Sequence, residues 1–239
     1  MFLERIAQLG LLEHNPETNI LKLFPLGVRQ GIVTSVVSFL GDAGTNASAV
    51  LSSDAHVRFA LECVGEGFRL PVDNAAVITA CVELYGRWLR DEHARPAALA
   101  AHYEEYTVRM LEQLTLLFVA RAHSKEEVAV QAELCRKALG LFMGVARQAL
   151  QRATWDRLLK LLLGSTDSVV SAAGAGATAE ERALGRLLAE RVMHDLYEAW
   201  LLSECRDDAL WTSFKLMNRG WLGVPEVTAQ WNATVLGLT

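Results

Sequence analysis

The segment SKEEVAVQAELCRKALGLF, residues 124–142, predicts a long amphipathic helix. Its first four residues have the form of a capping box, in which the serine side chain accepts a hydrogen bond from the backbone N–H three residues on and the glutamate reaches back. Apolar residues then recur at steps of three and four along one face: Val128, Ala132, Cys135, Leu139 and Phe142. This segment therefore indicates an α-helical fold.

The same two signals, a start residue and helical spacing, recur along the rest of the chain. Residues 178–181, Thr-Ala-Glu-Glu, repeat the capping-box form, and Asp73 is a candidate N-cap for a helix that runs through Trp88. Pro25 and Pro225 each open a predicted helix, because proline is tolerated in the first turn. Period-two alternation bounded by turn signals is hard to find. We therefore predict an all-α protein, either an irregular α-solenoid of the armadillo or HEAT kind or a multi-helix bundle.

Two breaks in the helical pattern bear on domain organisation. Residues 41–53 are rich in Gly, Asn, Ser and Asp and are predicted to form a surface loop. Residues 171–178 contain a Gly/Ala run and are predicted to form a linker. We expect one helical domain over residues 1–239, and a subdivision into residues 1–170 and 179–239 at this linker is the alternative.

The composition of the 239-residue chain excludes several classes of protein. A hydrophobic content of 51% and a charged content of 21% exclude a disordered chain, and a net charge of −5 gives no electrostatic reason to expect nucleic acid or an anionic membrane as partner. The longest strongly apolar uncharged stretch, residues 31–41, is too short for a membrane span. Charges at Glu4 and Arg5 do not fit a secretory signal. We expect a soluble, cytoplasmic protein with free, buried cysteines.

Motifs that would indicate an active site are weak. Residues 174–179 formally match the dinucleotide fingerprint GxGxxA, but Trp155 and Leu162 before them have helical rather than strand spacing, which favours a linker. Glu190 and His194 share one helical face as a single pair, which favours a solvated contact over a metal site. No P-loop, GxSxG elbow or HExxH motif occurs in the sequence. We therefore predict no catalytic, cofactor-binding or metal-binding residue, and no enzyme activity.

Tryptophans and charge suggest surfaces instead of an active site. Trp211, Trp221 and Trp231 follow one another at intervals of ten residues, and tryptophan is enriched at interface hot spots, so they are the candidate partner-interface residues, with core packing as the alternative. Residues 121–160 hold eight basic and four acidic residues, whereas residues 178–210 hold four basic and eight acidic ones. The two segments are predicted to be complementary neighbouring helices or a bipolar docking surface.

Several local patterns occur in the order found in one known family. They are Phe24-Pro25, Val36-Val37 to Leu40-Gly41, the turn Gly67-Phe68-Arg69-Leu70-Pro71-Val72-Asp73, Arg152-Ala153-Thr154-Trp155 before a leucine run, Leu188-Ala189-Glu190, and Ala199-Trp200-Leu201-Leu202, with Trp211 and Trp231 further on. From about residue 20 to the end, the chain resembles the N-terminal region of the β subunit of the Ral GTPase-activating protein complex. This resemblance implies a non-catalytic helical scaffold that pairs with a catalytic α-like GTPase-activating subunit and acts indirectly on a Ral-type small GTPase.

Two other functions stay open at this point. The abundant Leu, Val and aromatic residues could line a cavity between helices, as in an α-helical protein that binds an apolar small molecule. The same helices would also suit an armadillo-like adaptor of an unrelated trafficking or signalling complex. An enclosed apolar pocket would favour the first of these alternatives, and a filled core with an exposed apolar surface would favour a scaffold or an adaptor.

Overall fold

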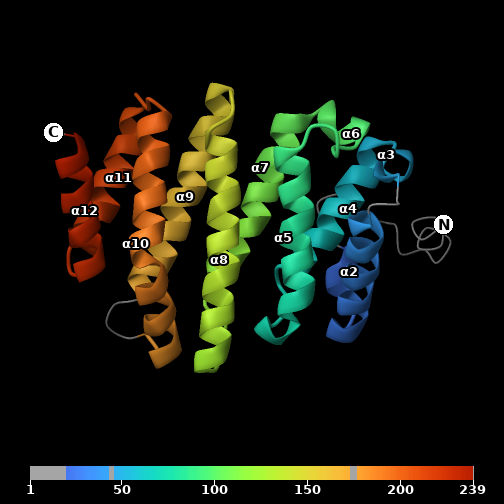
Figure 1. Cartoon of the computed structure of the whole chain (residues 1–239), viewed down its shortest axis with the longest axis horizontal. Helices are drawn as coiled ribbons and strands as arrows, with labels where there is room; N and C mark the ends of the chain where they lie inside the picture. Colours follow the sequence, from blue (N-terminus) through green and yellow to red (C-terminus); the bar gives the residue numbers. More distant parts are fainter. Residues whose placement is uncertain (1–19, 43–45, 173–176, 239) are drawn as a thin grey trace.

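The computed structural model describes residues 20–42, 46–172 and 177–238, and over these residues the chain is helical with no β-strand. The all-α prediction is confirmed. The helices form two layers in one long row (Figure 1). The first layer contains α2 (Leu26–Gly41), α5 (Ala75–Arg90), α8 (Lys125–Ala146), α10 (Ala179–Leu202) and α12 (Pro225–Leu238). The second layer contains α4 (Asp54–Gly67), α7 (Tyr103–Leu114), α9 (Arg152–Ala172) and α11 (Asp208–Trp221).

Contacts within the layers follow the order of the row. In the first layer, α5 packs between α2 and α8, while α10 packs between α8 and α12. In the second layer, α7 packs against α4 and α9, and α9 also packs against α11. The layers are joined most extensively where α9 meets α10. Short helices complete the connections: η1 (Ile20–Leu23), α3 (Ala47–Val50), η2 (Val72–Asn74), α6 (Ala97–Ala100) and η3 (Thr115–Phe118).

The capping signals behave largely as the sequence predicts. Thr178 Oγ1 accepts a hydrogen bond from the Glu181 N–H at 3.1 Å and Glu181 accepts one from the Thr178 N–H at 2.7 Å, which completes a capping box. Ser124 Oγ accepts from the Glu127 N–H at 3.1 Å, but Glu127 accepts from the His123 N–H, one residue earlier than a capping box requires. The N-cap prediction for Asp73 is wrong, because α5 begins only after η2 and has Asn74 at its N-cap.

The apolar face of α8 is buried throughout, and it carries one buried polar residue, Gln131. The Gln131 Oε1 atom accepts hydrogen bonds from the backbone N–H groups of Arg121 and Ala122, both at 3.2 Å. Its Nε2 atom donates to the carbonyls of Leu117 and Val119, at 3.0 and 2.7 Å. One side chain thus satisfies four backbone groups in the segment that leads from η3 into α8.

The basic and acidic segments lie on adjacent helices. Arg147, just after α8, forms an ion pair with Glu198 of α10 at 2.7 Å, and Arg136 Nη2 of α8 donates to the Leu187 carbonyl of α10 at 3.3 Å. These contacts favour complementary neighbours over a bipolar docking surface. Among the described residues, no helix is both long and apolar enough to cross a membrane.

Candidate partner-binding surface

An aromatic cluster joins the last three helices of the row. Tyr197 and Trp200 come from α10, Trp211 and Phe214 from α11, and Trp231 from α12. The Trp200 ring centroid lies 4.3 Å from that of Phe214 and 5.4 Å from that of Trp211. The Tyr197 centroid lies 5.9 Å from that of Phe214 and 5.6 Å from that of Trp231. Each such pair adds about 0.5–1.5 kcal/mol to the effect of burial, so the rings help to hold α11 and α12 on α10.

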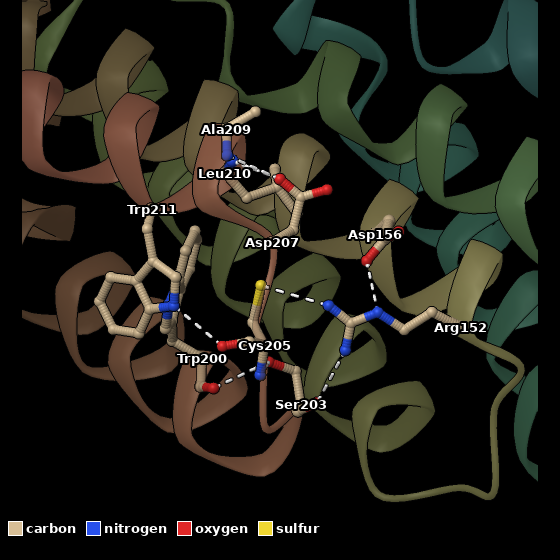
Figure 2. A network of polar contacts seen from close by, with 9 residues as sticks. All are labelled: Arg152, Asp156, Trp200, Ser203, Cys205, Asp207, Ala209, Leu210 and Trp211. Atoms are coloured by element: carbon tan, nitrogen blue, oxygen red, sulfur yellow. Dashed lines mark hydrogen bonds and ion pairs between the residues drawn. The ribbon is translucent and has the colours of Figure 1, made fainter.

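Trp211, the first interface candidate, belongs to the junction between α10 and α11. Figure 2 shows its indole beside the loop, where Nε1 donates to the Cys205 carbonyl at 2.9 Å. The side chain is half-buried and packs against the core. The structure therefore gives Trp211 an internal role at the start of α11 while leaving part of its ring accessible.

Polar contacts from α9 fix the other side of this junction (Figure 2). Arg152 Nε lies 3.0 Å from Asp156 Oδ1, and its two terminal nitrogens lie 3.4 Å from the Ser203 carbonyl and from Cys205 Sγ. Glu204 between them has a φ of 47°, in the left-handed region that non-glycine residues seldom adopt. The arginine thus contacts the residues on either side of a strained turn.

Asp207 forms the N-cap of α11 just after this turn. Its Oδ1 atom accepts hydrogen bonds from the Ala209 and Leu210 N–H groups at 2.8 and 2.9 Å. These backbone hydrogen bonds, from Leu210 first and then Ala209, lower the pKa of Asp207 because they favour its ionised form. Sequence reasoning did not single out Asp207, although an aspartate before an apolar helical pattern is a recognised start signal.

Trp221, the second interface candidate, is buried in the core, with 2% of its surface exposed. Its Nε1 atom donates to Asp167 Oδ1 of α9 at 2.9 Å, so the polar atom of the side chain is also satisfied inside the chain. A partner could reach this ring only after α11 had moved away from α9.

Trp231, the third candidate, combines a core contact with an accessible face. Its ring packs against Tyr197, yet 47% of the residue is exposed. Other large apolar residues near the end of the chain are also exposed: Leu216 at 69%, Leu222 at 67% and Leu236 at 75%. Of the three tryptophans, Trp231 offers the most surface to a partner.

The remaining sequence motifs show no assembled active site in the described part of the chain. Residues 173–176, which include both glycines of the GxGxxA match, lie outside the described residues. The segment before them is α9, a helix, where the dinucleotide fingerprint needs a strand. His194, Asp195 and Glu198 do come together on α10. Arginines already contact the two carboxylates, because Arg191 lies 2.7 Å from Asp195 and Arg147 lies 2.7 Å from Glu198.

The four cysteines are free and buried, as the sequence predicts. Burial in an apolar environment raises the pKa of Cys63, Cys81 and Cys135 to about 12 in each case. These three thiols are therefore protonated at neutral pH, which is unfavourable for nucleophilic chemistry.

A groove between α5 and α8 is a feature that sequence reasoning missed. Its volume is about 560 Å³, and its lining includes Gly86 of α5 and Gly140 of α8. A Cβ atom would meet nothing within 4 Å at Gly140, but at Gly86 it would lie 3.3 Å from Leu141 Cδ2. Arg87, Arg90 and Lys137 also line it. Arg87 Nη2 donates a hydrogen bond to the Leu40 carbonyl at 3.1 Å, so one of the three basic side chains of the groove has a partner within the chain. Glycines in the middle of predicted helices were the sequence signal available for this groove. Whether such glycines line a groove depends on how α5 and α8 pack against each other, which the sequence alone does not give.

The comparisons with known proteins find one family model and several longer relatives. The RALGAPB N-terminal domain family matches residues 127–239. Ral GTPase-activating protein subunit beta of Mus musculus is 30% identical over 98% of the chain, and that of Homo sapiens is 29% identical over the same share. A Rap-GAP domain-containing protein of Dictyostelium discoideum is 35% identical over 45% of the chain and 7% of its own length. No solved structure matches the chain significantly.

The matched region is a small part of the longer relatives. The chain spans 16% of the length of the mouse and human subunits. The family match begins at Glu127 in the first turn of α8 and therefore includes the aromatic cluster. The chain is thus similar over nearly its whole length to Ral GTPase-activating protein subunit beta, and its residues 127–239 match the RALGAPB N-terminal domain family.

Proposed function

We propose that this chain is a non-catalytic, cytoplasmic scaffold domain that helps to assemble a Ral-type GTPase-activating complex. In this proposal it associates with a catalytic α-like subunit and so regulates a Ral-type small GTPase indirectly. The observation that carries the proposal is similarity over 98% of the chain to subunit beta. The two-layer row of helices supports it, because such rows present extended surfaces to partners.

The chemistry of the described residues also favours a scaffold over an enzyme. Three cysteines have pKa values raised to about 12, and the carboxylates of the His194 cluster are held by arginines. The surface of the chain, by contrast, exposes large apolar side chains at the end of the row, of which Trp231 is one. Exposed apolar residues that gather in one region mark interaction sites.

Co-expression with the catalytic α subunit of a Ral GTPase-activating complex tests the proposal. We expect the two chains to co-purify at a fixed ratio through a second, size-based separation. The tagged chain without the α subunit, and the α subunit with an unfused tag, are the controls. Failure to co-purify while circular dichroism shows a folded helical chain would contradict an assembly role.

Single-turnover GTP hydrolysis tests the non-catalytic part separately. The purified chain should leave the rate of a Ral-type GTPase unchanged, whereas the catalytic α subunit in the same assay should raise it. Acceleration that follows the chain through repurification would show that it is an enzyme after all.

A further inference from the structure

The groove between α5 and α8 lies within the first layer, where the two helices pack side by side (Figure 1). Val82 and Leu141, two of the residues that line it, are buried, so the bottom of the groove is apolar. At Gly140 a Cβ atom would meet nothing within 4 Å, so another chain can approach the backbone of α8 closely there. The volume of about 560 Å³ suits a short stretch of peptide or a small ligand.

Lys137 is the basic residue of this groove that has a carboxylate beside it. Its Nζ atom lies 3.9 Å from Glu83 Oε1, which is longer than a hydrogen bond. The two side chains are 39% and 67% exposed, and ion pairs at the surface contribute little to stability. A carboxylate from outside the chain can therefore replace Glu83 beside Lys137 at little cost.

The two arginines of the groove form no ion pair within the part of the chain that the structure describes. Arg87 donates to the Leu40 carbonyl at the end of α2, a contact that leaves its charge without a counter-charge. Arg90 Cζ lies 4.0 Å from the position that a Cβ atom of Gly86 would take, so the guanidinium lies over α5 at the groove instead of extending away from it. Arg90 thus offers an uncompensated positive charge beside an apolar surface.

Two acidic residues also line the groove, and they limit what it can bind. Asp91 Oδ1 accepts a hydrogen bond from the His93 N–H at 2.9 Å in the loop after α5, and Glu83 lies beside Lys137. Three basic and two acidic side chains leave the groove with a charge of +1, on a chain whose net charge is −5. Such a groove attracts one or two carboxylates, whereas the acidic chain around it repels a long polyanion.

We propose that this groove binds a short acidic segment of a partner protein. One carboxylate of the segment pairs with Arg90 on the α5 wall and a second pairs with Lys137 on the α8 wall, while apolar side chains between them pack on Val82 and Leu141. Arginine suits the first role because its guanidinium donates two parallel hydrogen bonds to a carboxylate. The segment must therefore combine acidic and apolar residues in close succession.

Fluorescence anisotropy with a labelled peptide of about ten residues, in which Glu alternates with Leu and Ala, tests the proposal on the chain alone. We expect a Kd between about 10 and 100 µM. The same peptide with Gln in place of Glu should bind at least about tenfold more weakly. Free glutarate at an equal carboxylate concentration should not displace the labelled peptide. The binding site goes beyond the proposed function, which names no surface, so its failure leaves the co-purification result unaffected.

Arg90→Glu and Lys137→Glu should each raise the Kd by about tenfold or more. Arg186→Glu is the matched control, because Arg186 is an exposed residue of α10 outside the groove and the change in net charge is the same. Gly140→Leu fills the groove without changing its charge and should weaken binding by a similar factor. Arg90 lies in the last turn of α5, where its charge also favours the helix dipole, so circular dichroism and thermal unfolding are measured for every variant.

An unsubstituted chain that binds no peptide up to about 1 mM would overturn the proposal. So would equal losses of affinity for Arg90→Glu and Arg186→Glu, because that result indicates a general attraction between charges. An unchanged Kd for a folded Gly140→Leu variant would show that the segment binds elsewhere, and displacement by glutarate would show a site for a small carboxylate instead of a peptide. Should Arg90→Glu fail to fold, Arg90→Gln removes the same positive charge and should weaken binding in the same direction.

Discussion

Trp221 of α11 donates its indole N–H to Asp167 of α9 across 2.9 Å. The two residues are 54 positions apart in the sequence, and the contact joins neighbouring helices of the second layer. The contact shows that Trp221 lies in the core. The ten-residue spacing of the three tryptophans in the sequence was compatible with either a core or a surface position. The stability of the chain should therefore depend on Trp221 far more than on Trp231.

Trp221→Ala should lower the free energy of unfolding by about 3–5 kcal/mol, because it removes a large buried side chain and leaves a cavity. Trp231→Ala, the matched control, should have a much smaller effect since its ring is 47% exposed. Urea titrations followed by circular dichroism measure both values. Equal losses for the two variants would contradict the difference in burial.

Gln131→Leu should destabilise the chain by about 2–4 kcal/mol, because the substitution leaves four backbone groups of the segment before α8 without their hydrogen-bond partner. The two side chains are similar in size, so little of the loss would come from packing. Chemical denaturation measures it. Gln151 is the control site, since it is exposed and its backbone N–H, rather than its side chain, donates to Glu104. Gln151→Leu should change the free energy of unfolding little, and an unchanged stability for Gln131→Leu would show that the hydrogen bonds are dispensable.

Gly67→Ala should lower stability by about 1–3 kcal/mol because of overpacking. A Cβ atom at this position would overlap Cys81 Sγ and lie 3.0 Å from Val33 Cγ1. Gly140→Ala is the matched control, because a Cβ atom there meets nothing within 4 Å. That variant should gain up to about 1 kcal/mol from helix propensity. Thermal unfolding of the two variants should therefore shift in opposite directions.

Stability should fall as the pH rises above about 9. The pKa values of Cys63, Cys81 and Cys135 are raised by burial from 9.0 to about 12, so the unfolded chain loses these protons at lower pH than the folded chain does. The stabilisation is complete below pH 9 and is lost as the pH rises towards 12, by up to about 1.4 kcal/mol per pH unit for each thiol. Urea titrations at pH 8, 9 and 10 measure the slope. Cys135→Ala should make it shallower, and an identical slope in that variant would rule out this thiol as a source.

Local sequence signals predicted the helices well where the signals were strong. Thr178 and Ser124 are N-caps as predicted, and the apolar positions of residues 124–142 are buried. Asp73 failed as an N-cap because the chain first forms η2, and the predicted loop over residues 41–53 includes the single-turn helix α3. The first error is a displacement of one residue, and the second is a single helical turn inside a segment whose composition is typical of a loop.

The partner-interface residues could not be separated by sequence alone. Trp221 and Trp231 belong to the same ten-residue spacing, but Trp221 joins α11 to α9 while Trp231 lies on α12, the last helix of the row. That difference comes from the pairing of helices far apart in the chain. A partner role for Trp211, Trp221 or Trp231, the subdivision near residue 170 and the small-molecule alternative stay predictions.

The row arrangement also has a consequence for how the molecule opens. A helix in the middle, such as α8 or α10, can unfold only when its packing contacts with the first-layer helices on both sides are broken. In contrast, α2 and α12 each pack against one described first-layer helix. Amide hydrogens should therefore exchange with solvent slowest in α8, α9 and α10 and progressively faster towards both ends. The centre of the row should therefore unfold last, and local unfolding should be most frequent at its two ends.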